Sequence, residues 1–143
     1  MKRFRFELAS VLRLAELEHR QALAELGRLV TALGSLREHA DLLRRTILHE
    51  ADRGEAAAAR QLYGAYRIAL VDSLRASELE VSRTEALVRD ARQRLDLKRT
   101  RRDALTRLEE QRFEAWRIEG AKQEQAELEE LASMRSQARR SSR

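Results

Sequence analysis

Apolar side chains recur along the first third of the chain at alternating steps of four and three residues. The positions are Leu8, Leu12, Ala15, His19, Ala22, Leu26, Leu29, Leu33, Leu36, Ala40, Leu43 and Ile47. All of them except His19 are apolar. An average step of about 3.5 residues keeps one stripe of a helix facing a partner helix under a left-handed supercoil. The pattern predicts a helix over about residues 3–51, roughly 70 Å long.

This stripe stops at Asp52-Arg53-Gly54-Glu55. Gly54 can take the left-handed conformation that commonly closes a helix, and the alanines at 56–59 restart a helix readily. We therefore expect a turn over about 52–57 and a second helix over about 58–138.

A second stripe follows the expected turn. It runs through Tyr63, Tyr66, Leu70, Leu74, Ser77, Val81, Thr84, Val88, Ala91 and Leu95. Two consecutive steps of four around Leu70 form a stutter, which locally unwinds a supercoil. The sequence thus predicts an all-α fold in which two long helices form an antiparallel coiled-coil hairpin.

The second helix is longer than the first, so the hairpin is expected to end in a C-terminal helical overhang. A turn near residue 54 places residue 8 opposite about residue 102 and leaves 105–138 without a partner in the chain. Phe113 and Trp116 lie on this overhang and are expected to contact another protein. Phe4 and Phe6 fit a hydrophobic plug at the end of the hairpin, with docking as the alternative. Residues 139–143 are expected to be a frayed tail.

Composition supports one coiled-coil domain over residues 1–143. Charged residues make up 37% of the chain and aromatic residues 4%, and proline is absent. Such a chain buries a narrow seam between helices, because it lacks the bulky side chains that fill a thick core. There is no cysteine, signal peptide or membrane-spanning stretch, so we expect a cytoplasmic protein.

The sequence offers little for catalysis, metal binding or cofactor binding. It has no glycine-rich phosphate loop, no nucleophile elbow and no His-x-x-x-His or cysteine pair. Paired helices also lack the water-excluding pocket that shifts the pKa of a catalytic group. We therefore expect no enzyme activity, no cofactor and no metal.

The net charge of +5 permits contact with nucleic acid. Arg44-Arg45, Arg101-Arg102 and the terminal arginines could contact phosphates, but no basic stretch is free of acids. No aromatic platform alternates with these arginines to stack bases. A basic helical nucleic-acid-binding protein remains an alternative, and specific nucleic-acid binding is not expected.

Three segments of the chain resemble the flagellar export protein FliJ family. The first is Phe4-x-Phe6-x-Leu8-x-x-Val11-Leu12-x-Leu14-x-x-x-Glu18. The second is Leu62-Tyr63-Gly64-Ala65-Tyr66-Arg67-Ile68-Ala69-Leu70, similar to an aromatic pair followed by leucine. The third, Glu124-Gln125-Ala126-Glu127-Leu128-Glu129-Glu130-Leu131-Ala132, is similar to a Glu-rich segment of that family, with Glu129 in place of an aspartate.

The resemblance implies a non-enzymatic part of the type III export apparatus in bacterial flagellum biogenesis and motility. It implies an antiparallel coiled coil like the central stalk of rotary ATPases, which regulates the hexameric export ATPase. It also implies binding to the membrane export gate and to export chaperones. The chain would then be cytoplasmic, peripheral to the inner membrane at the flagellar base, and a monomer when free. An injectisome stalk homologue is the alternative with the same architecture.

The resemblance also implies where partners bind. The gate-contact surface near the hairpin tip maps onto Leu36, Ala40, Leu43, Ile47, Tyr66 and Leu70. Tyr63 pairs with Tyr66, and the two tyrosines fit either partner contact or packing in the seam. The stalk analogy presents the paired termini, with Phe4, Phe6, Phe113 and Trp116, to the ATPase ring.

Overall fold

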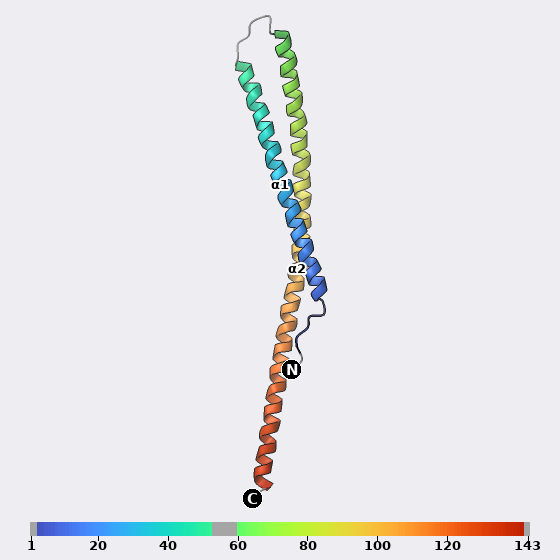
Figure 1. Ribbon diagram of the computed structural model, residues 1–143, viewed down its shortest axis with the longest axis vertical. Coiled ribbons are helices and arrows are strands. Elements are labelled where there is room, and N and C mark those ends of the chain that lie inside the picture. Colours follow the sequence, from blue (N-terminus) through green and yellow to red (C-terminus); the bar gives the residue numbers. More distant parts are fainter. Residues whose placement is uncertain (1–2, 53–59, 142–143) are drawn as a thin grey trace. The chain divides into compact units, whose positions relative to one another are not determined.

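A computed structural model describes residues 3–52 and 60–141 of the chain (Figure 1). Within these residues there are two helices, α1 (Ala9–Asp52) and α2 (Arg60–Ser141), and no strand. The two long helices pack against each other, which confirms the predicted helical hairpin. No described helix is long and apolar enough to cross a membrane.

The helix boundaries differ from the expected ones at both ends of the chain. α1 begins at Ala9 and not near residue 3, and residues 3–8 are not helical. The Ala9 N–H donates to the Phe6 carbonyl at 3.2 Å, and the Leu12 N–H makes the first helical bond to the Leu8 carbonyl. α2 continues to Ser141, so residues 139–141 of the expected frayed tail are helical. The expected turn at 52–57 lies outside the described residues except for Asp52, which ends α1.

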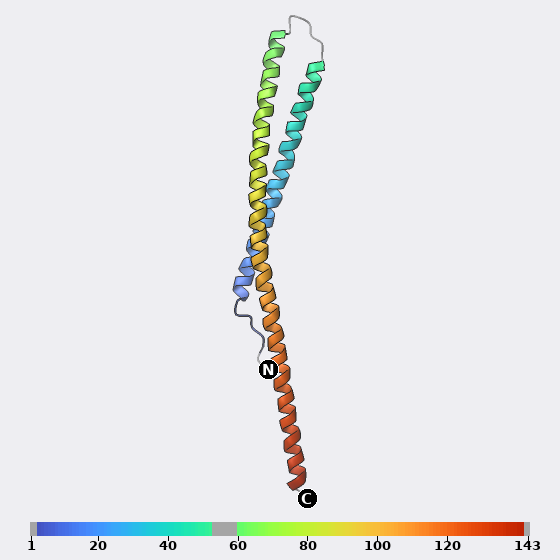
Figure 2. The same cartoon turned by 180° about the vertical axis from the view of Figure 1, so that it is seen from behind.

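Contacts within the chain divide it into two compact units, 18–99 and 1–17 with 100–143. In the first unit α1 and α2 run antiparallel and lie side by side (Figures 1 and 2). The ion pairs between its two helices include Glu18–Lys98, Glu25–Arg94, Arg37–Glu85 and Arg44–Glu78. As the residue number rises along α1, that of its partner on α2 falls, which is the register of an antiparallel pair.

The same ion pairs correct the predicted register. Glu18 lies opposite Lys98, so the pairing continues to place residue 8 near residue 108 and not near 102. Leu8 and Leu108 line one hollow in the second unit, in agreement with this register. The estimate from the sequence paired residues whose numbers sum to about 110, whereas the numbers of Glu18 and Lys98 sum to 116 (18 + 98).

The seam between the helices is buried where the spacing of apolar residues predicts. On α1, Leu12, Ala15, Leu33 and Ala40 are buried, and the other predicted seam residues are half-buried except Leu8, which is 39% exposed. On α2 the buried seam residues are Ser77, Thr84, Val88 and Ala91. Among the described residues no large side chain is completely buried, so the core is a narrow seam.

Candidate partner-binding surfaces

The residues predicted to contact the export gate belong mostly to the seam of the 18–99 unit. Ala40 is buried, Tyr66 is exposed, and the rest are half-buried: Leu36, Leu43, Ile47, Tyr63 and Leu70. These residues follow the seam positions along α1 and α2, and their contact with the gate stays a prediction. Tyr66, with 48% of its surface exposed, is the member most accessible to a partner.

A set of exposed apolar side chains near the same end of the hairpin was missed by the sequence reasoning. Leu42 and Leu48 of α1 are 60% and 68% exposed, and Leu62 and Ile68 of α2 are 81% and 65% exposed. Figures 1 and 2 show α1 and α2 separating toward this end of the 18–99 unit. The signal in the sequence was apolar residues lying off the seam, which the spacing analysis set aside.

Tyr63 ties the two helices together near that end. Its hydroxyl donates a hydrogen bond to the backbone carbonyl of Glu50 on α1. This carbonyl belongs to the last turn of α1, where carbonyl oxygens find no N–H donor within the helix. Tyr63 therefore fixes the end of α1 against α2. This favours packing between the helices over partner contact as the role of the Tyr63 side chain.

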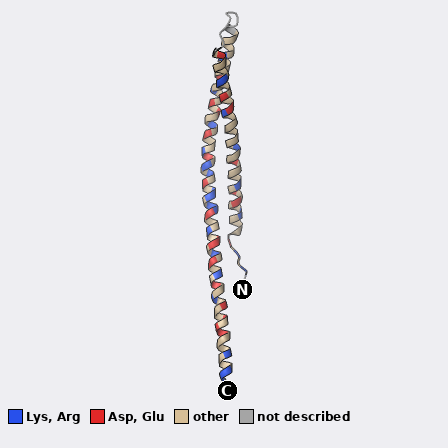
Figure 3. Cartoon of the chain, turned by 90° about the vertical axis from the view of Figure 1, so that its left-hand side faces the viewer, with Lys and Arg blue, Asp and Glu red and all other residues tan. Residues whose placement is uncertain are grey.

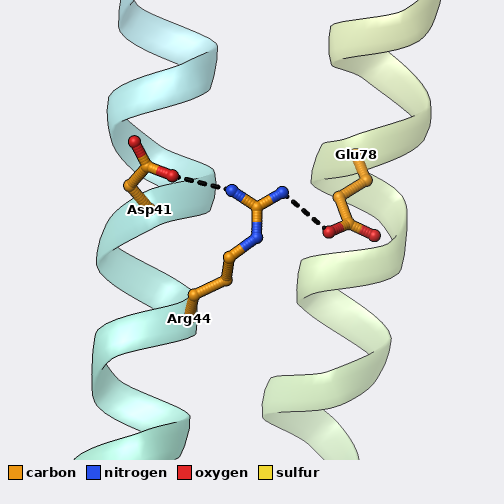
Figure 4. A network of polar contacts seen from close by, with 3 residues as sticks. All are labelled: Asp41, Arg44 and Glu78. Atoms are coloured by element: carbon orange, nitrogen blue, oxygen red, sulfur yellow. Dashed lines mark hydrogen bonds and ion pairs between the residues drawn. The ribbon is translucent and has the colours of Figure 1, made fainter.

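A polar network crosses the seam beside the predicted gate surface. Arg44 donates to Asp41 on its own helix at 2.7 Å and to Glu78 on α2 at 2.8 Å (Figure 4). The hydrogen bond to Glu78 is the main cause that raises the pKa of the Arg44 guanidinium above its ordinary value. With the Arg37–Glu85 pair, this network borders a hollow of about 470 Å³ whose lining includes Ala40.

In the unit formed by 1–17 and 100–143, three aromatic side chains form a cluster. The Phe4 ring meets the Phe113 ring edge-on at 5.2 Å between centroids and the Trp116 ring at 5.8 Å. Phe113 and Trp116 stack on each other at 5.7 Å. Phe6 is 9% exposed. The expectation that no surface of the chain covers Phe113 and Trp116 was wrong, because residues 3–8 leave the helical path and pack on α2.

A hollow of about 350 Å³ lies beside this cluster. It is lined by residues 3–8 together with Leu108, Arg112 and Trp116 of α2. Its apolar lining consists of Phe4, Phe6, Leu8, Leu108 and Trp116, and its charged lining is three arginines and one glutamate. The sequence did not predict that Arg3, Arg5, Leu108 and Arg112 line a hollow. Their signal was the alternation Arg-Phe-Arg-Phe-Glu-Leu at 3–8, whose period of two is typical of a non-helical segment.

Beyond this hollow α2 has no covering segment among the described residues. Apart from Gly120, residues 117–140 are exposed, including Ile118, Leu128, Leu131 and Met134. Basic and acidic side chains alternate along both helices, and basic ones gather near the end of α2 (Figure 3). The expected overhang therefore begins after Trp116 and not at residue 105.

The described residues contain no group of three or more His, Cys, Asp or Glu side chains that could hold a metal ion. Their carboxylates and guanidiniums lie on helix surfaces, often in ion pairs such as Arg117–Glu114 at 2.7 Å. Apolar side chains surrounded by charged ones form a surface to which other proteins can bind.

The family model described as Flagellar FliJ protein matches residues 4–141. No curated protein and no solved structure matches the chain. The family match runs through both compact units and includes every predicted partner-binding residue, from Phe4 to Trp116.

Proposed function

The chain belongs to the flagellar FliJ protein family, and from this premise we propose that it links the export ATPase to the export gate. Membership makes it a component of the flagellar type III export apparatus. The match over residues 4–141 is the observation that carries the proposal. We propose further that the protein binds export chaperones and resides in the cytoplasm, at the flagellar base beside the inner membrane.

Two groups of apolar side chains that are at least partly exposed, one in each unit, support the proposal of two partners. In the 18–99 unit, Tyr66 and the neighbouring exposed leucines would contact the gate. In the other unit, the Phe4–Phe113–Trp116 cluster would contact the ATPase. ATP hydrolysis would then be the work of the partner, and the helices would act on its rate or assembly through contact alone. The family described is the flagellar one, which favours this role over an injectisome stalk.

The test measures ATP hydrolysis by the purified hexameric export ATPase with and without the full chain. We expect the chain to raise hydrolysis or hexamer assembly, and Trp116→Ala to reduce that effect. Tyr66→Ala should keep the ATPase effect and weaken binding to the purified gate protein. Leu97→Ala is the matched control, because Leu97 is 72% exposed and lies in neither surface. An ATPase whose hydrolysis and assembly do not respond to the chain would refute the proposal.

A further inference from the structure

The hollow between residues 3–8 and α2 combines an apolar surface with uncommitted positive charge. Phe6 and Trp116 belong to its apolar part, and Phe6 is held in place by burial. A volume of about 350 Å³ is at the lower end of the range for ligand pockets, enough for one bulky apolar side chain.

Arg3, Arg5 and Arg112 make no ion pair with the described part of the chain, although all three line the hollow. Some arginines of the described residues are paired across the helices, as Arg37 is with Glu85 and Arg44 with Glu78. A guanidinium binds a carboxylate through two parallel N–H donors, so a free one beside an apolar surface favours an acidic group on the ligand.

Glu7 is the only carboxylate in the lining, which leaves the hollow with an excess of two positive charges. The nearby Glu114 is bound to Arg117 and Asp103 to Arg102. The lining itself therefore presents net positive charge to an incoming anion.

We propose that this hollow binds an acidic segment of a partner protein, with one bulky apolar side chain of that segment seated against Phe6 and Trp116. The carboxylates of the segment would pair with Arg3, Arg5 and Arg112. The hollow's volume of about 350 Å³ is small for a long acyl chain, which favours a peptide over an anionic lipid as the ligand. The inference rests on the proposed function for the nature of the partner, a protein, and adds the chemistry by which that partner is recognised.

The test titrates the full chain with a blocked synthetic peptide in which glutamates flank a single phenylalanine. Trp116 is the only tryptophan of the chain, so its fluorescence reports binding at the hollow directly. Calorimetry gives the affinity independently of the fluorophore. We expect saturable binding that weakens with added salt, because the arginines around the hollow are exposed. A peptide with lysine in place of glutamate should not bind, and one with alanine in place of phenylalanine should bind more weakly.

Arg112→Gln should weaken binding about two- to fivefold, the range of an exposed ion pair, and combination with Arg5→Gln should weaken it further. Arg107→Gln is the matched control, an exposed arginine of the same helix that does not line the hollow. Circular dichroism confirms that each variant keeps its helices.

Three outcomes would overturn the inference. They are no peptide binding, an equal loss of peptide affinity in Arg112→Gln and Arg107→Gln, or binding only to vesicles of phosphatidylglycerol and phosphatidylcholine. Peptide binding without an effect on the ATPase would retain the hollow and refute the proposed function. An ATPase effect without peptide binding would refute the hollow as a peptide-binding site and retain the proposed function.

Discussion

Replacing Ser77 by alanine should stabilise the protein. Ser77 lies in the seam of α2, is 7% exposed, and its Oγ has no hydrogen-bond partner among the described residues. A buried hydroxyl without a partner costs about 1–3 kcal/mol, and the narrow seam favours the lower value of about 1 kcal/mol. Alanine also forms helix better than serine by about 0.5 kcal/mol. The Ser77→Ala variant should therefore gain about 1.5 kcal/mol.

Ser82→Ala separates the two contributions. Ser82 is exposed on the same helix, so its replacement should gain only the helix propensity of about 0.5 kcal/mol. Urea unfolding followed by far-ultraviolet circular dichroism measures both variants. With a slope of about 2 kcal/mol per molar urea, the midpoint should rise by about 0.7 M for Ser77→Ala and about 0.25 M for Ser82→Ala. Equal shifts, or a lower midpoint for Ser77→Ala, would show that the buried hydroxyl is not destabilising.

Three further substitutions test other parts of the structure. Phe4→Ala should move the Trp116 emission to longer wavelength while leaving helix content nearly unchanged; unchanged emission would show that Phe4 does not cover the indole. A double-mutant cycle on Glu18 and Lys98, 2.9 Å apart and partly exposed, should give a coupling of about 0.5–1 kcal/mol that falls with salt; zero coupling at low salt would contradict the pairing. Leu33→Ala, at a position 7% exposed, should lower the unfolding free energy by about 2 kcal/mol in urea titration, and a loss below about 0.5 kcal/mol would place Leu33 outside the seam.

The seam was predictable because it depends on spacing alone. Leu12, Leu33 and Ala40 recur at the spacing that returns a residue to the same side of a helix, and all three are buried. Tyr66 departs from this rule because of the stutter. At about 100° per residue, the two consecutive steps of four place Tyr66 about 80° around the helix from Leu74, at the edge of the stripe, and Tyr66 is 48% exposed.

The aromatic cluster could not be predicted from local pattern. Phe4 and Trp116 lie far apart in the sequence, and their contact depends on the register of the two helices. The register predicted from a turn at Gly54 was wrong. No proline or glycine marks the start of α1 at Ala9, so the sequence pattern predicts a helix that extends back through residues 3–8. The gate-contact and ATPase-contact residues stay predictions, because the structure places them without showing a partner.

The packing of residues 3–8 on α2 bears on how the protein is labelled for capture experiments. A purification tag at the amino terminus would be attached close in sequence to residues 3–8, which line the hollow together with Arg112 and Trp116. It would compete there with any natural ligand and give false negatives in co-purification. An epitope attached after the exposed 117–140 stretch avoids that hollow and leaves residues 3–8 unchanged.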